Sequence, residues 1–185
     1  DVSFVNIEGP FWYGRPPGKK GGIVFGNYAY DMDNLLWAGF NCFSLANNHL
    51  YDCGEAGVIN TIEILEEKRR EHPRRNLLWA GTGLTPEDVS CSSVAVINDV
   101  KVVFSAYTAR FNKPGRLYNA YSGKKATRIL KEAAGADLKI VSVHHGEEFR
   151  HVPSKDIIRE FRALVDAGAD IVLGHHPHVP QGIEK

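Results

Sequence analysis

Four short segments of this 185-residue chain combine residue types that bind metal ions. The segments are Asn6-Ile7-Glu8, Asn47-Asn48-His49 with Asp52 close behind, His144-His145-Gly146-Glu147-Glu148, and His175-His176-Pro177-His178. Carboxylate, amide and imidazole ligands without thiolate suit Mn, Fe, Zn or Mg rather than a structural zinc ion. Two such ions close together could clamp a phosphate or carbonyl group and generate hydroxide, while a nearby imidazole protonates the leaving group. The pattern therefore indicates metal-assisted hydrolysis.

Each of these segments follows a stretch of sequence that is typical of a buried β-strand. The predicted strands are almost continuously apolar and cover residues 3–7, 41–46, 138–143 and 170–173. In open α/β sheets, ligands bind outside the carboxyl ends of the strands. Six of the eight histidines lie in the last three segments, so we expect the four strand ends to meet around one site.

Helix-like segments alternate with these strands. The predicted helices cover residues 27–38, 54–75, 122–133 and 154–168. Ser122 and Ser154 are the predicted caps of the last two helices. The other predicted elements are a strand over 77–80, a hairpin of 93–97 and 102–107, and surface loops over 14–26 and 111–120. The alternation predicts a single α/β domain over residues 1–185, with a largely buried sheet and some antiparallel pairing.

Composition and charge exclude several classes of protein. Lys plus Arg and Asp plus Glu both number 22, so the zero net charge gives no support to nucleic-acid binding. An apolar content of 43% argues against disorder. The odd count of three cysteines, without a Cys-x-x-Cys pair, disfavours a disulfide framework or a cysteine zinc site. No apolar run reaches the roughly 18 residues of a transmembrane helix, and no signal peptide or anchor is visible.

Each candidate segment also has a structural interpretation. Taken alone, Asn47-Asn48-His49 is typical of a loop or helix cap, and His144-His145-Gly146 of a turn. The segment from His175 to His178 is different, because three histidines in four residues are costly as packing. The four segments together favour a metal or anion site over these separate readings.

Other conspicuous residues are interpreted as structural. The cysteines, Cys42, Cys53 and Cys91, are predicted to be core or incidental residues. The tryptophans, Trp12, Trp37 and Trp79, are predicted to serve packing rather than ligand binding. The segment 81–83, Gly-Thr-Gly, lacks the spacing and the lysine of a phosphate-binding loop and is predicted to be a turn.

A further set of motifs runs through the chain in a fixed order. The motifs are Asn6-Ile7-Glu8-Gly9-Pro10, Ala38-Gly39-Phe40, Ser44-Leu45-Ala46-Asn47-Asn48-His49, Asp52, Gly54, Ser105-Ala106-Tyr107-Thr108, His144-His145-Gly146-Glu147-Glu148, Val165-Asp166-Ala167-Gly168-Ala169-Asp170, Gly174-His175-His176-Pro177-His178 and Gln181-Gly182-Ile183-Glu184. In residues and order they resemble the CapA family, the poly-gamma-glutamate capsule biosynthesis family of the calcineurin-like metallophosphatase superfamily. The resemblance implies an αββα sandwich of mixed sheets flanked by helices.

The resemblance also implies roles for individual residues. His49 is similar to the general acid of the superfamily. The implied metal ligands are Glu8, Asn48, His144, His176 and His178, with His175 as an alternative ligand. The implied substrate-binding residues are Asn6, Asn47, His145 and His175. The expected cofactors are divalent ions (Mn, Zn, Fe or Mg), two of them in the intact protein.

Two departures from the family pattern are notable. The family begins with a strand that ends in Gly-Asp and ends with a further strand after the histidines; we expect both to lie outside this chain. His145 stands where the family usually has Trp, and it could add a ligand or fill the same space. Family members are commonly anchored outside the cytoplasmic membrane, so the resemblance implies an extracellular or secreted location and a membrane-associated capsule synthesis complex.

Three functions compete on this basis. The first is a metal-dependent hydrolase or transferase that acts on a phosphoester or an amide-like bond of an anionic polymer. The second is a non-catalytic, polymer-binding component of capsule synthesis or export. The third is a plain α/β domain whose histidines are structural. The metal-dependent hydrolase accounts for the most residues.

Overall fold

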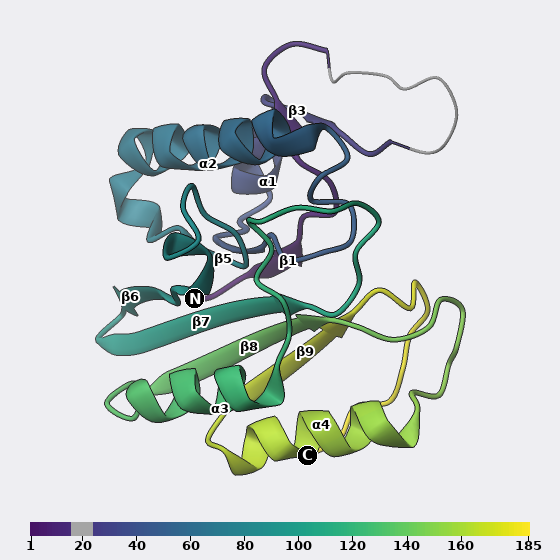
Figure 1. Ribbon diagram of the computed structural model, residues 1–185. Coiled ribbons are helices and arrows are strands. Elements are labelled where there is room, and N and C mark those ends of the chain that lie inside the picture. Colours follow the sequence, from purple (N-terminus) through teal and green to yellow (C-terminus); the bar gives the residue numbers. More distant parts are fainter. Residues whose placement is uncertain (16–23) are drawn as a thin grey trace.

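The computed structural model describes residues 1–15 and 24–185, and two β-sheets form its centre (Figure 1). The first sheet is parallel, in the order β1-β4-β5, with strands Phe4–Asn6, Cys42–Ser44 and Leu78–Ala80. The second sheet has the order β6-β7-β8-β9, with strands Ser93–Ile97, Val100–Thr108, Leu138–His144 and Ile171–His175. Its β6–β7 pair is antiparallel and its other pairs are parallel, which confirms the α/β class and the hairpin.

In residues 1–15 and 24–185, four α-helices cover the outer faces of the two sheets. Their bounds are α1 Asp31–Trp37, α2 Gly54–Glu71, α3 Gly123–Glu132 and α4 Lys155–Asp166. In Figure 1, α1 and α2 lie over the first sheet, and α3 and α4 lie under the second. Short 3₁₀ turns occupy Pro73–Arg75 and Asp88–Ser90. The layers therefore run helix, sheet, sheet, helix.

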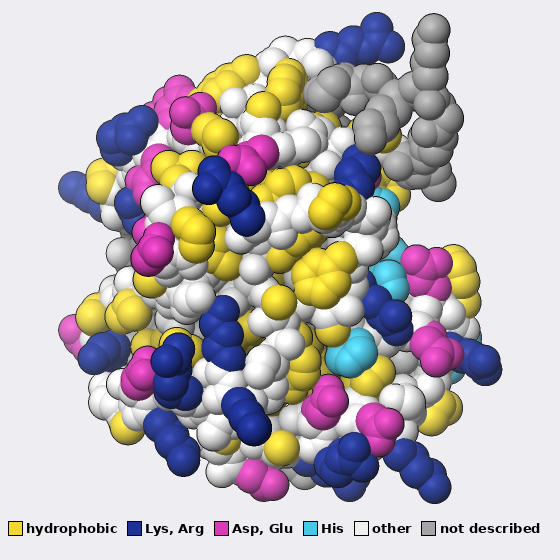
Figure 2. Space-filling view, viewed as in Figure 1, with side chains coloured by type: hydrophobic (Ala, Val, Ile, Leu, Met, Phe, Trp, Pro, Cys, Tyr) yellow, Lys and Arg dark blue, Asp and Glu magenta, His cyan; other side chains and the backbone are white. Residues whose placement is uncertain are grey.

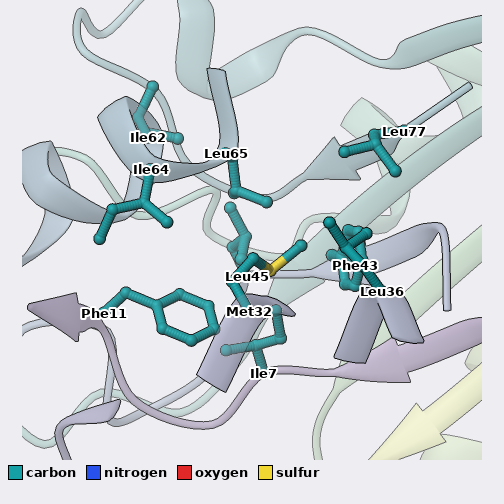
Figure 3. Close-up of a cluster of buried hydrophobic side chains, with 10 residues drawn as sticks. All are labelled: Ile7, Phe11, Met32, Leu36, Phe43, Leu45, Ile62, Ile64, Leu65 and Leu77. Atoms are coloured by element: carbon teal, nitrogen blue, oxygen red, sulfur yellow. The ribbon is translucent and has the colours of Figure 1, made fainter. Parts of the chain in front are cut away.

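The described residues form four buried hydrophobic clusters, and three of them hold these layers together. The first lies between α1, α2 and the first sheet, where Met32, Phe43 and Leu65 are fully buried (Figure 3). The second lies between the two sheets and contains Phe104. The third joins the second sheet to α3 and α4 and contains Leu164. Strands β4, β7 and β8 are therefore buried over most of their length, as parallel strands covered on both faces require, whereas β9 at the sheet edge stays partly exposed.

Two elements differ from the sequence predictions. The predicted helix over 27–38 begins only at Asp31, because Asn27–Tyr28 forms strand β3 beside β2, Phe11–Trp12. The Asp31 carboxylate accepts a hydrogen bond from the Tyr28 amide at 2.9 Å and sets the turn between strand and helix. Ser122 occupies the cap position of α3 but makes no side-chain cap bond, so that capping prediction is wrong.

Other sequence predictions are confirmed or corrected at single residues. The Ser154 hydroxyl caps α4 by accepting a hydrogen bond from the Ile157 amide at 3.4 Å. Trp37 is 89% exposed at the end of α1, so its predicted packing role is wrong. The predicted surface loop over 111–120 is in part internal, since Leu117 is fully buried. Of the predicted loop 14–26, residues 16–23 lie outside the described part of the chain.

Two further expectations concern the cysteines and the length of the helices. All three cysteines are free thiols within the described residues, and Cys42 lies in the core between the sheets. Over the same residues, every helix is too short or too polar to cross a membrane.

Candidate metal centre

The carboxylate of Glu8 lies at the centre of a group of imidazoles. Its Oε1 atom is 3.8 Å from His49 Nε2, 4.0 Å from His144 Nε2 and 3.7 Å from His178 Nε2. That oxygen is buried, and the described part of the chain offers it no hydrogen-bond partner. These separations exceed a hydrogen bond, but the ligand atoms of one zinc-like ion lie about 3–4 Å apart when each bond is about 2 Å.

Strand ends from both sheets build this centre, as the sequence predicted. Glu8 and Asn48 follow β1 and β4 of the first sheet, while His144 and His178 end or follow β8 and β9 of the second. The Ile7 amide bonds to the Ser44 carbonyl at 2.9 Å and extends the β1–β4 pairing towards Glu8. Within each sheet these strands are parallel, so their carboxyl ends meet on one side, at the right of Figure 1. On this side Figure 2 shows histidine side chains gathered at the surface.

Asn47 and Asn48 have different roles in this geometry. The Asn47 amide donates to the Ile7 carbonyl at 2.7 Å and accepts from the His49 amide at 3.1 Å, so it holds the two loops together. Asn48 Oδ1 accepts from His144 Nε2 at 2.8 Å, inside the centre. Asn47 was predicted to bind substrate, but both ends of its side chain serve the fold here.

His144 is fully buried and uncharged. Burial, followed by the neighbouring histidines, lowers its pKa from 6.5 to about 2. Its Nδ1 atom is buried and, among the described residues, has no hydrogen-bond partner. A neutral imidazole is the form that binds a metal ion. His144 is therefore held in its ligating state.

Asp52 fixes the orientation of His49. Its Oδ2 atom lies 2.7 Å from His49 Nδ1 and also accepts from the Phe25 amide at 2.9 Å, while Lys113 Nζ is 3.3 Å from Oδ1. Burial alone would raise the pKa of Asp52, but the hydrogen bonds from His49, the Phe25 amide and Lys113 outweigh it and lower the pKa. With Nδ1 held in this way, His49 Nε2 faces Glu8. The sequence signal for this contact is the three-residue spacing between His49 and Asp52, which by itself assigns Asp52 no role.

A second group of possible ligands adjoins the first. Ligand atoms of Glu148, His176 and His178 all lie within 4.8 Å of one another. The His144 and His176 rings are 5.0 Å apart between centroids, and His178 belongs to both groups. Glu148 received no role from the sequence, and its place beside the strand-end histidines was the only signal. Two adjacent ions would thus share the His178 region.

His176 and His178 have left-handed backbone beside the centre. The φ of 101° at His176 and the φ of 55° at His178 are unusual for residues with a side chain. In a regular strand, His175 and His176 would point to opposite faces of the sheet. Such strain is tolerated mainly where the surrounding structure requires it, often at functional sites.

Three of the predicted site residues, His175, His145 and Asn6, are not among the side chains that converge on Glu8. The His175 ring stacks on Phe4 at 5.2 Å between the sheets. His145 points towards α4, where its Nε2 lies 3.7 Å from Glu160 Oε2. Asn6 has a buried Oδ1 that finds no partner in residues 1–15 and 24–185.

We expect the partly buried His175 to make the ion-free protein acid-sensitive. Burial lowers its pKa from 6.5 to about 4, so below pH 6.5 the unfolded chain binds more protons than the folded one. Stability is therefore lost as the pH falls through this window, by about 3 kcal/mol at pH 4 from His175 alone. Urea unfolding from pH 7 to pH 4 in EDTA measures this loss. His175→Phe, which keeps the stack on Phe4, should reduce it, and an unchanged pH dependence would contradict the expectation.

Comparison with known proteins agrees with the order of motifs. The family model described as "Bacterial capsule synthesis protein PGA_cap" matches residues 1–185. The chain belongs to this family. Curated relatives of this chain that are named CapA confirm the resemblance to the CapA family.

Three of these relatives are informative. The chain is 33% identical over 163 residues to the capsule biosynthesis protein CapA of Bacillus anthracis, covering 80% of this chain and 37% of the relative. It is 31% identical to the PGA biosynthesis protein CapA of Bacillus subtilis, covering 78% and 38%. It is 26% identical to a probable polyglutamine synthesis accessory protein of Mycobacterium tuberculosis, covering 100% and 51%. The chain thus spans about two fifths to one half of the length of these relatives.

The possible ligand atoms at the strand ends of this chain fit a divalent cation. One carboxylate oxygen of Glu8 and the ring nitrogens of His144 and His176 are buried without hydrogen-bond partners in the described ranges. Such groups are costly unless a cation or water satisfies them. The described residues contain another group of possible ligands away from the strand ends, which consists of Asp33, Glu71 and His72. It lies largely at the surface, and Lys68 already pairs with its two carboxylates at 2.7 and 2.8 Å. The strand-end centre is therefore the stronger candidate.

Proposed function

We propose that this chain carries a metal-dependent hydrolase site of the metallophosphatase type and acts in poly-gamma-glutamate capsule biosynthesis. The observation that carries the proposal is a set of buried donor atoms without hydrogen-bond partners among the described residues: Glu8 Oε1, which lies 3.7 Å from His178 Nε2, and the Nδ1 atoms of His144 and His176. The order of the layers, which is helix, sheet, sheet, helix, supports an αββα sandwich of the metallophosphatase type. The names of the curated relatives support the role in capsule synthesis.

Divalent ions would be held by side chains from both sheets. The residues are Glu8, Asn48, His144, His176 and His178, with Glu148 added from the geometry. Ions of this kind polarise a phosphoryl or carbonyl oxygen and make water more acidic. Mn, Zn, Fe and Mg all accept such ligands to different degrees, and thiolate is not part of the set.

His49 would act as the general acid. Its Nδ1 is fixed by Asp52 at 2.7 Å, so Nε2 is free to hold a proton towards a bound substrate. The Asp52 carboxylate would stabilise the protonated ring, and Lys113 and the Phe25 amide keep that carboxylate in place. Asn112 Nδ2 lies 3.4 Å from His49 Nε2 and would help to orient a polar substrate group.

The substrate would be a phosphoester or an amide-like bond in an anionic polymer. Arg110 and Lys113 supply positive charge near the histidines. The family resemblance further supports an extracellular or secreted location beside a membrane-associated capsule synthesis complex. Because the chain spans about half or less of its curated relatives, these statements about the whole protein are proposals.

His49→Ala tests this function. We expect hydrolysis of bis(p-nitrophenyl) phosphate or poly-gamma-glutamate, measured with Mn or Zn, to fall about 100- to 10,000-fold because a positioned acid is lost. Metal binding, measured by titration calorimetry, should change little because His49 is not among the proposed ligands. His151→Ala is the matched control, since His151 is exposed and outside the site, and it should leave both readouts unchanged.

Other outcomes distinguish the competing functions. If the parent protein binds metal and polymer but turns over neither substrate, and His49→Ala still binds polymer, the non-catalytic binding component is favoured. If the parent protein binds no divalent ion and its histidines titrate without metal-linked stabilisation, the histidines are structural and the proposal fails.

A further inference from the structure

The loop that joins β8 to α4 carries an exposed aromatic ring beside the metal centre. Phe149 in this loop is 70% exposed, and its ring lies 6.4 Å from the His178 ring between centroids. Phe149 also directly follows Glu148, whose ligand atom lies within 4.8 Å of those of His176 and His178. The ring therefore adjoins the proposed ligands both along the chain and in space.

The backbone of Phe149 has a conformation that aromatic residues rarely adopt. Its φ of 59° is left-handed, which is an outlier for a bulky residue. Two hydrogen bonds of 2.7 Å hold the loop there: the Phe149 amide donates to the Pro177 carbonyl, and the Gln181 side chain donates to the Arg150 carbonyl. In Figure 1 these two segments lie side by side at the right. Glycine would adopt this conformation without strain, so the backbone gives no reason for a phenylalanine here.

The charges around Phe149 limit what its ring can bind. Aromatic rings attract apolar groups and cations. A cation is disfavoured here, because ions held by the neighbouring ligands would be positively charged and would repel it. The adjacent Arg150 is already paired, since its Nε lies 3.3 Å from the Glu147 carboxylate. An apolar group is therefore the partner that fits this ring.

We propose that Phe149 determines substrate specificity by packing against an apolar group next to the bond that is cleaved. The inference rests on the proposed hydrolase function and narrows its substrates to phosphoesters or amides that carry an aromatic or aliphatic group there. Such a group covers apolar surface that Phe149 otherwise exposes to water, and this burial increases affinity. The strain at Phe149 is then offset by substrate binding and not by the fold.

Phosphonate binding tests this specificity without turnover. Methylphosphonate and phenylphosphonate carry the same anionic group and differ only in the apolar part. Their binding to the whole chain loaded with Zn is measured by titration calorimetry. We expect phenylphosphonate to bind at least about tenfold more tightly than methylphosphonate. Phe149→Ala should remove most of this preference and leave methylphosphonate binding unchanged, whereas Phe149→Tyr should keep the preference.

Val152→Ala is the matched control for the phosphonate experiment. Val152 is an apolar residue of the same loop and is 78% exposed, but it lines a cavity beside α4. This variant should therefore keep the preference for phenylphosphonate.

The ion-free protein gives a second readout, which separates a role in binding from a role in the fold. Phe149→Gly should raise the melting temperature in EDTA by roughly 2 °C, because glycine relieves the left-handed strain and an exposed ring adds little to the fold. Phe149→Ala, which keeps the strain, should change the melting temperature little.

The outcomes distinguish this proposal from the proposed function. The specificity role is overturned, and the metal site stands, if the chain binds Zn but binds neither phosphonate or both equally. It is also overturned if Phe149→Ala and Val152→Ala change the preference equally, or if Phe149→Gly lowers the melting temperature. If the chain binds no divalent ion, the proposed function fails and the specificity role fails with it.

Discussion

Glu8→Gln is expected to weaken divalent-ion binding by at least about 100-fold while leaving the ion-free protein as stable as the parent or more so. The loss follows because Glu8 Oε1 is the one carboxylate oxygen on which His49, His144 and His178 converge. The stability follows because this buried oxygen lacks a partner among the described residues, and a neutral amide is less costly to bury than a charge. Opposite effects on binding and on stability are typical of a residue that serves a ligand and not the fold.

Thermal unfolding with and without Zn or Mn measures both effects in one experiment. A bound ion raises the melting temperature of the parent in proportion to the logarithm of its concentration, and this rise should disappear in Glu8→Gln. Asp33→Asn is the matched control, because Asp33 belongs to the exposed acidic cluster that Lys68 already neutralises. Equal loss of metal-linked stabilisation in both variants would show that the strand ends are not the binding centre.

Phe104→Ala is expected to destabilise the protein by about 3–5 kcal/mol. Phe104 is fully buried between the sheets and makes an edge contact with Phe4, with ring centroids 5.8 Å apart. Removal of the ring leaves a cavity where the two sheets meet, and the surrounding structure can fill it only in part. Urea unfolding measures the change, and Phe149→Ala, at a residue that is 70% exposed, is the control with little expected effect.

The same substitution should also weaken metal binding. One sheet supplies Glu8 and Asn48 and the other supplies His144 and His178, so their distances depend on how the sheets pack. The contact between Phe4 and His175 and the hydrogen bond of 3.0 Å between Ser44 and Ser142 hold this interface next to the site. If Phe104→Ala lowers stability but leaves metal affinity unchanged below its melting temperature, the positions of the ligands do not depend on this part of the core.

Much of the candidate site could be predicted from the sequence. Four apolar strands that end in polar residues indicate the site, because carboxyl ends of parallel strands meet at one edge and burial leaves ligands only at the ends. The pattern points to the segments that contain Glu8, Asn48, His144 and His178, and the family resemblance implies that these residues are ligands. The order of motifs also identified the family.

The local sequence could not determine how the side chains at each strand end are directed. The His176 ring lies beside His144 in the centre, whereas His145 and His175 turn towards Glu160 and Phe4. These directions depend on the packing of α4 and of the opposite sheet, which involves residues far away in sequence. The same holds for Trp37, where the end of α1 is exposed although the residue is strongly apolar.

Long-range contacts also decided which polar residues support the site. Asp52 is fixed by Lys113 and the Phe25 amide, 61 and 27 residues away, and only this arrangement turns it towards His49. Local spacing thus determined which residues end the strands and which family the chain belongs to. The tertiary structure alone decided which of those residues meet, because two sheets bring their ends together only when the core between them is packed.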